Sequence, residues 1–281
     1  MKKLVLAAAI TAIASSVLAA DYSVKPKVTS LKAQPQTVLI VGNSYTYYNC
    51  GLFDYLWGFS GASKTKKLET QMSATAAAGL DWQDVKGLVQ PTGNSWSFLL
   101  KKHDGRLFDA VILQGNSLEP IDPRMKDSFR KYAALHSKTI READGEPLLM
   151  ITWARDGKPE MTQQLADATI KVANENNAMA VPVGLAFAEV QRRHPEIKLI
   201  MPDHSHPTAA GSYLAGAVIW STLLKESLEG NTFPGGCEKP LPPDVTLKLQ
   251  KGRMGCHESF LRLVVQRSGV DRKPNSEASL C

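Results

Sequence analysis

The chain has 281 residues, of which 43% are hydrophobic and 21% are charged, so it contains enough apolar material for a substantial core. This composition excludes fibrous, collagen-like and intrinsically disordered proteins. The formal net charge of +6 is mild. The sequence contains no stretch dense in Lys and Arg and interleaved with aromatic residues, so we expect no nucleic acid partner.

The first twenty residues have the pattern of a secretory signal. Lys2 and Lys3 precede an apolar run from Leu4 to Leu18, and Ala19 and Ala20 offer small residues for cleavage. The apolar run is shorter than the ~20 residues that span a bilayer, and no later segment reaches that length. The sequence therefore predicts a signal peptide over residues 1–20 and a periplasmic or secreted protein, with no membrane span after signal removal.

Five short apolar runs predict strands. Most are apolar without interruption, which is typical of strands buried on both faces of a parallel sheet. The runs are Thr37–Gly42, Leu68–Met72, Phe108–Gln114, Leu148–Trp153 and Met179–Val183.

Longer segments with helical spacing separate these runs. Residues 123–143 and 161–176 have apolar side chains at helical intervals, and residues 208–225 are apolar almost all round, so the last of these helices should be well buried. Alternating strands and helices predict an α/β fold, a three-layer α/β/α domain over residues 37–227. Residues 21–36 form an N-terminal lead to it.

Residues 228–281 differ in composition from the preceding domain. Prolines and glycines between positions 231 and 244 resemble a hinge, and we interpret this part as a C-terminal extension packed on the main domain. In an oxidising compartment, cysteines pair by default, and four cysteines allow three connectivities. We favour Cys237 with Cys256, which leaves Cys50 with Cys281.

Polar residues follow the first and third predicted strands and precede the last helix. Ligands bind beyond the carboxyl ends of strands in open parallel sheets, so these positions are candidates for a site. A serine nucleophile needs an imidazole base and a carboxylate that fixes the base's tautomer. Ser44, His206 and Asp203 are of these types, and Asp203 lies three residues before His206.

Ser44 is expected on a turn between a strand and a helix, and Gly42 would let that turn bend tightly. The first backbone N–H groups of a helix have no partner within it, so they can face a developing oxyanion. The side-chain amide of Asn116 could add another donor. Together these residues predict nucleophilic catalysis on an ester.

Three segments resemble the SGNH hydrolases, also called the GDSL family. Residues 42–46 (GNSYT) look like the first block of this family, residues 113–117 (LQGNS) like the third, and residues 203–208 (DHSHPT) like the last. The third segment has Ser117 where an Asp is usual in the family. The resemblance implies a flavodoxin-like five-stranded parallel sheet, no metal or cofactor, and hydrolysis of carboxylic esters through an acyl-serine intermediate.

The resemblance also implies a role for each site residue. Ser44 would be the nucleophile and one oxyanion donor, His206 the base, Asp203 the residue that orients it, and Asn116 a side-chain donor. The second block supplies a backbone donor, for which Gly79 is the available glycine. Ala78 would take this role if the alignment shifted by one residue.

Other residues near these segments have two interpretations each. Tyr45, Tyr47 and Trp153 could line a substrate-binding cleft or pack in the core. His204 could join Asp203 and His206 around a metal, but no fourth ligand is apparent, so we expect no metal. His136 is expected at the surface.

The leading prediction is an exported serine esterase that acts on acyl or acetyl esters of a small molecule or a glycan. Two alternatives stay open from the sequence. One is an O-acetyltransferase that acts on a sugar, and the other is a non-catalytic periplasmic binding or assembly protein with a vestigial site.

Overall fold

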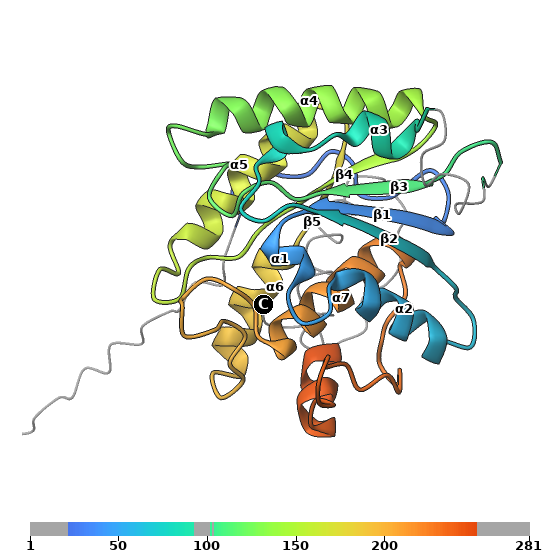
Figure 1. The fold of residues 1–281 in the computed structure, drawn as a ribbon. Coiled ribbons are helices and arrows are strands. Elements are labelled where there is room, and N and C mark those ends of the chain that lie inside the picture. Colours follow the sequence, from blue (N-terminus) through green and yellow to red (C-terminus); the bar gives the residue numbers. More distant parts are fainter. Residues whose placement is uncertain (1–21, 93–101, 103, 252–281) are drawn as a thin grey trace, which may run out of the picture.

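The computed structural model describes residues 22–92, 102 and 104–251 (Figure 1). Five parallel strands form one sheet in the order β2-β1-β3-β4-β5. This arrangement confirms the predicted fold class. The predicted signal peptide lies outside the described residues. The strands are β1 (Thr37–Gly42), β2 (Glu69–Ala74), β3 (Ala110–Leu113), β4 (Glu146–Met150) and β5 (Met179–Val181).

The central strands are buried because both faces of the sheet are covered. In β1, Ile40 lies opposite Met72 of β2 and Ile112 of β3, and every residue of β1 and β3 is buried. β2 is an edge strand with a single neighbour, and its residues are exposed or half-buried. This explains why the segment that forms β2 is the least apolar of the five predicted runs.

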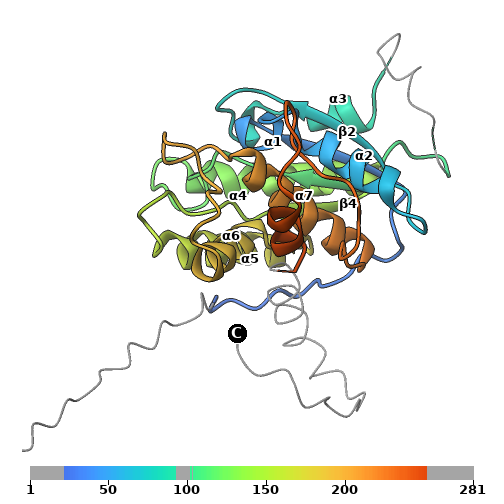
Figure 2. The same ribbon diagram turned by 90° about the horizontal axis from the view of Figure 1, so that it is seen from below.

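Helices form a layer on each face of the sheet (Figures 1 and 2). Successive strand residues point to opposite faces, so Ile40 joins one apolar cluster and Leu39 the other. α2 (Leu52–Ala62), α6 (Val183–Arg193) and α7 (Ala209–Leu224) cover the face of Ile40. The face of Leu39 is covered by α3 (Val85–Val89), α4 (Lys126–Glu142) and α5 (Met161–Glu175).

The last helix of the domain is the most deeply buried. Nearly all residues of α7 are buried, as its apolar sequence predicted, and Thr208 caps its start by accepting a hydrogen bond from the Gly211 N–H. Among the helices of the described residues, none is both long enough and apolar enough to cross a membrane.

The end of β5 differs from the prediction. We expected a strand over residues 179–183, but the strand ends at Val181 and α6 begins at Val183. Pro182 separates them, and its missing N–H cannot continue a sheet ladder. The apolar run therefore continues directly into the buried residues of α6, and the sequence pattern alone did not show where the strand ends and the helix begins.

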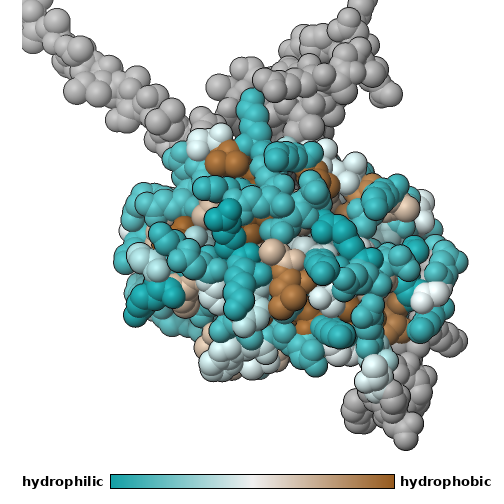
Figure 3. All heavy atoms as spheres, turned by 90° about the horizontal axis from the view of Figure 1, so that it is seen from above, coloured by the Kyte–Doolittle hydropathy of each residue, from teal (hydrophilic) through white to brown (hydrophobic). Residues whose placement is uncertain are grey.

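The layer of α3, α4 and α5 presents a mostly hydrophilic outer surface, on which hydrophobic residues form separate patches (Figure 3). Phe129 and Ile140 of α4 point inward instead, toward the sheet. His136 was expected at the surface, but it is 5% exposed, and its Nε2 lies 2.8 Å from the carbonyl oxygen of Leu80. Burial lowers the pKa of His136 and favours the neutral ring.

The segments that flank the domain pack on it. In the N-terminal lead, Val28 forms a parallel bridge with Met179 of β5, and Ser23 donates hydrogen bonds to Asp167. Residues 228–251 lie beside α7 and include a helix over residues 243–251 (Figure 2). There, Phe233 makes an edge-on ring contact with Phe59 of α2.

One disulfide joins the C-terminal segment to the domain. It links Cys50 to Cys237, with their Cα atoms 5.4 Å apart. The predicted pairing of Cys237 with Cys256 and of Cys50 with Cys281 is therefore wrong. The packing of Phe233 against α2 brings Cys237 to the start of that helix, where Cys50 lies. Cys256 and Cys281 lie outside the described residues.

Removal of this disulfide should destabilise the fold. The bond joins residues that are 187 positions apart, so it restricts the unfolded chain strongly. We expect the double variant Cys50→Ser/Cys237→Ser to lose about 2–4 kcal/mol of unfolding free energy in urea titrations. A reductant should lower the stability of the wild type to that of the variant and leave the variant unchanged. Equal stability without reductant would contradict the pairing.

Candidate active site

Ser44 lies at the carboxyl edge of the sheet, where α1 (Ser44–Tyr47) begins two residues after β1 ends. Asn43 caps this helix, and its side chain accepts a hydrogen bond from the Tyr45 N–H. Gly42 has no left-handed φ. A Cβ at this position would, however, come within 2.6 Å of Oε1 of Gln114 and within 2.7 Å of Cγ2 of Thr46. The glycine thus permits both the close approach of Gln114 and the close fold of the turn onto Thr46.

The three residues predicted to form a triad are hydrogen-bonded in series. Nε2 of His206 lies 2.9 Å from Oγ of Ser44, and Nδ1 of His206 lies 2.6 Å from Oδ2 of Asp203. The second carboxylate oxygen of Asp203 accepts the N–H groups of Ser205 and His206 at 3.0 and 2.9 Å. This local turn holds the carboxylate beside the ring, so the spacing of three residues has a structural reason.

The electrostatics of the pair favour a base at Nε2. The hydrogen bond from His206 lowers the pKa of the Asp203 carboxyl to about 2, so Asp203 is ionised at neutral pH. An ionised carboxylate fixes the proton of a neutral imidazole on Nδ1, which leaves a lone pair on Nε2. That lone pair can accept the proton of Ser44.

Aromatic side chains support the loop that carries His206. The ring of Tyr48 stacks on His206 with 4.3 Å between centroids and 10° between planes. The hydroxyl of Tyr45 lies 3.0 Å from Oγ of Ser205, and Nε1 of Trp153 donates to the carbonyl oxygen of Ser205 at 3.0 Å. The residue next to His206 is thus fixed from two sides.

The residues considered for a substrate cleft differ in exposure. Tyr45 and Trp153 are 3% and 1% exposed, and their rings stack with centroids 4.2 Å apart. Tyr47, by contrast, is 36% exposed. The structure therefore places Tyr45 and Trp153 beneath the His206 loop and leaves Tyr47, three residues after Ser44 on α1, at the surface.

Asn43 connects the loops that surround Ser44. Its side-chain amide donates to the carbonyl oxygens of Ala78 and Gly115 at 2.9 and 3.1 Å. Its backbone N–H donates to Oε1 of Gln114 at 3.0 Å. Asn43 is 2% exposed, so these bonds are buried. This connecting role of Asn43 is not visible in the GNS motif alone, because its partners come from distant loops.

Asn116 lies beside the loop of the second block. Its Nδ2 donates to the carbonyl oxygen of Ala77 at 3.1 Å, and its Oδ1 accepts the N–H of Leu118 at 3.2 Å. These two bonds fix the orientation of the amide. In the same loop, the N–H of Ala78 donates to the carbonyl oxygen of Thr75 at 3.2 Å, so this alternative donor is already engaged.

Glu119 is a buried carboxylate in the loop after β3 that carries Asn116, and the sequence motifs did not point to it. It is 1% exposed and accepts the N–H of Asn116 at 2.8 Å and the N–H of Leu80 at 3.2 Å. Burial raises the pKa of its carboxyl. A Cβ at Gly115 would collide with Oε2 of Glu119. The sequence signal that could have pointed to Glu119 is an acidic residue three positions after Asn116.

His204 does not join the triad. Its Nδ1 lies 3.2 Å from Oδ2 of Asp156. Within the described ranges, no group of three or more His, Cys, Asp or Glu side chains could hold a metal ion.

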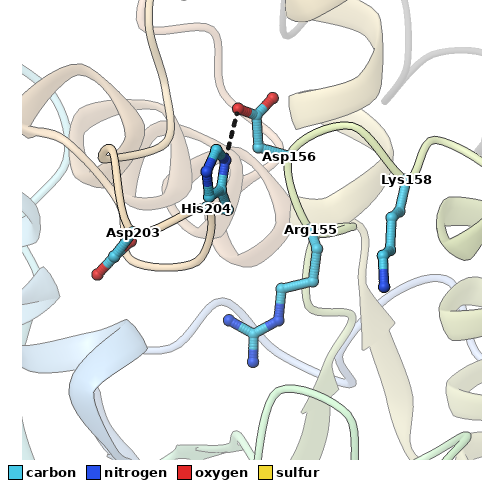
Figure 4. A pocket seen from close by; sticks show the side chains of 5 residues that line it. All are labelled: Arg155, Asp156, Lys158, Asp203 and His204. Carbon is cyan, nitrogen blue, oxygen red and sulfur yellow. Dashed lines mark hydrogen bonds and ion pairs between the residues drawn. The ribbon is translucent and has the colours of Figure 1, made fainter.

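A cavity of about 390 Å³ adjoins the triad (Figure 4). Asp203 belongs to both the triad and the cavity wall. The other lining residues are Arg155, Asp156, Lys158 and His204.

No protein family model matches the chain, and no curated protein matches it. Solved structures do resemble it. A DUF4886 family protein from Bacteroides uniformis has a TM-score of 0.58 at 17% identity, over 80% of this chain and 94% of its own. A protein from Slackia heliotrinireducens, described as an SGNH hydrolase, has a TM-score of 0.51 at 22% identity, over 66% of this chain and 98% of its own.

A further similar structure is an acetyl xylan esterase from Geobacillus stearothermophilus. Its TM-score is 0.50 at 15% identity, over 67% of this chain and 94% of its own. At these identities the likeness shows the fold. The chain therefore has the α/β fold of the SGNH hydrolases, as predicted from its sequence.

Glu119 should contribute strongly to stability. Glu119→Ala leaves the buried N–H of Leu80 and the half-buried N–H of Asn116 without an acceptor, so the unfolding free energy should fall by at least about 1–3 kcal/mol. Glu119→Gln keeps the shape and one acceptor oxygen, so its loss should be smaller. Urea titrations of the three proteins measure both effects, and an alanine variant as stable as the wild type would contradict this role.

The glutamine variant also gives a pH test. Because the folded-state pKa of Glu119 is raised above its ordinary 4.5, its ionisation is less favourable in the folded state. The wild type should therefore lose stability relative to Glu119→Gln as the pH rises from that value through the raised pKa. The opposite slope would show that the carboxylate is stabilised by its surroundings.

Proposed function

We propose that this protein is a serine esterase that hydrolyses carboxylic esters through an acyl-serine intermediate. The observation that carries this proposal is the hydrogen-bonded series of Ser44, His206 and Asp203 at the carboxyl edge of a sheet with the SGNH hydrolase fold. The order and types of these residues are those that nucleophilic attack by a serine requires.

In the first step, Oγ of Ser44 attacks the ester carbonyl carbon while Nε2 of His206 takes the hydroxyl proton. The carbonyl π electrons move to oxygen, and a tetrahedral intermediate forms. Asp203 stays ionised and stabilises the resulting imidazolium.

The oxyanion of this intermediate needs preorganised donors. We assign the backbone N–H of Ser44, the backbone N–H of Gly79 and the side-chain amide of Asn116. An amide nitrogen carries two hydrogens, and Asn116 uses one for the carbonyl oxygen of Ala77, so the other is available. Gly79 is preferred to Ala78 because the Ala78 N–H donates to Thr75.

The intermediate collapses when His206 gives its proton to the leaving alcohol oxygen and the carbon–oxygen bond breaks. Water then attacks the acyl-serine, and His206 takes a proton from it as general base. A second tetrahedral intermediate releases the carboxylic acid and returns the proton to Ser44. The residues needed for both halves of the reaction are the same.

The proposed substrate is defined only as a class of ester. Tyr47 is exposed and lies three residues after Ser44 on α1, and its ring suits contact with an acyl chain or a sugar face, while Tyr45 and Trp153 form the support beneath the His206 loop. An acetyl xylan esterase shares the fold, which is consistent with acetyl or other short acyl esters of a small molecule or glycan.

We further propose that the protein is exported to the periplasm or secreted. Its first twenty residues have the pattern of a secretory signal, and the disulfide between Cys50 and Cys237 would persist in an oxidising compartment.

Loss of the nucleophile should abolish turnover. Ser44→Ala is expected to lower kcat for p-nitrophenyl acetate by about 10³-fold or more, because the covalent step is removed. The wild type should be labelled by a fluorophosphonate probe, and the variant should not. Circular dichroism checks that the variant is folded. Activity that survives in a folded Ser44→Ala variant would overturn the proposal.

Loss of the side-chain oxyanion donor should affect the transition state selectively. Asn116→Ala is expected to lower kcat by about 10²–10³-fold with little change in KM. Gln163→Ala, which removes an exposed amide on α5, is the matched control and should behave as the wild type. A change confined to KM would instead indicate ground-state binding.

A further inference from the structure

The cavity beside the triad is formed by two loops. Arg155, Asp156 and Lys158 lie on the loop that leads from β4 to α5, and Asp203 and His204 lie on the loop before α7. Figure 4 shows the side chains of Arg155 and Lys158 extending in the same direction from their loop. The proposed reaction does not use either cation.

The carboxylates of this cavity already have partners. Asp203 accepts a hydrogen bond from His206, and Asp156 lies 3.2 Å from the ring of His204. Among the residues that the structure describes, no carboxylate lies within ion-pair distance of Arg155 or Lys158. Neither cation is therefore held in an ion pair, and both can contact a ligand in the cavity.

Arg155 is oriented by neutral groups. Its Nη2 donates to Oγ of Ser117 at 2.8 Å, and its guanidinium lies 5.9 Å from the ring centroid of Tyr45, the residue after Ser44. A guanidinium has five N–H donors in a planar fork, so the bond to Ser117 leaves others for a ligand. Such a fork fits the two oxygens of a carboxylate, and a nearby ammonium adds to the attraction.

We infer that Arg155 and Lys158 bind a carboxylate group of the substrate, so that the preferred ester carries a negative charge in its acyl or alcohol part. This inference rests on the proposed function and narrows its substrate class. Arg155 would supply the directional contact because it is half-buried and held by Ser117. Lys158 is exposed and would contribute charge without a fixed geometry.

Matched esters that differ in one charge test this inference. The first pair is 4-acetoxybenzoate and its methyl ester, which place the charge in the leaving group. The second pair is 4-nitrophenyl hydrogen succinate and 4-nitrophenyl methyl succinate, which place it in the acyl group. For at least one pair, Arg155→Met should lower kcat/KM about tenfold more for the anionic ester than for the neutral one. Comparing variant with wild type cancels intrinsic differences in reactivity.

Three further variants sharpen the test. Lys158→Met should show the same selective loss to a smaller extent, because its charge is exposed and screened. Ser117→Asp should reproduce the effect of Arg155→Met, because the new carboxylate would pair with the guanidinium. Lys171→Met removes an exposed charge from α5 and should leave both esters of each pair unaffected. An equal effect of Arg155→Met on both esters in both pairs would overturn the inference.

Calorimetry on Ser44→Ala separates this inference from the proposed function. In that background, the anionic ester of at least one pair should bind at least about tenfold more tightly than its neutral counterpart, and Arg155→Met should remove the difference. This readout needs no turnover. If the protein hydrolyses p-nitrophenyl acetate but shows no charge preference in either ester pair, only the inference is overturned. Absence of hydrolysis with an Arg155-dependent binding preference would overturn the proposed function alone.

Discussion

The buried side chain of Asn43 is the contact on which the geometry of the candidate site depends. Its amide bonds the loop after β2 and the loop after β3, and its oxygen caps the helix that begins with Ser44. A buried amide that loses a partner costs about 1–3 kcal/mol, so the three segments resist separate movement. Glu119, in the loop after β3, accepts the N–H of Asn116 in its own loop and the N–H of Leu80 after β2, and so adds a further link between the two. These bonds therefore hold the start of α1, the loop after β2 and the loop after β3 in one fixed arrangement around Ser44.

Much of the fold and the core of the candidate site could be predicted from the sequence. A strand that is covered on both faces has an uninterrupted apolar sequence, so β1 and β3 could be recognised from their composition. The series of Ser44, His206 and Asp203 depends on residue types that follow strand ends or precede a helix, and parallel topology brings these ends together. The sheet therefore supplies the long-range proximity that the sequence alone does not display.

The remaining features depend on packing between distant segments. The disulfide partner of Cys50 was predicted wrongly because the pairing depends on how the C-terminal segment packs on the domain, as in the contact of Phe233 with α2. His136 was expected at the surface, and Glu119 was not singled out, because both are polar residues. Each is nevertheless buried against a backbone group of a distant segment. Gly42 also makes room for a side chain that its sequence neighbours do not reveal, since Gln114 directly follows the adjacent strand β3.

The disulfide also constrains the order in which the molecule can be completed. Cys50 lies just after α1, whereas Cys237 comes after the last strand and the last domain helix in the chain. During synthesis the bond can close only once nearly the whole domain has emerged. The disulfide therefore fixes the turn after α1, close to Ser44, only late in synthesis. A chain that stops before residue 237 would contain Ser44, Asp203 and His206 but could not form this disulfide.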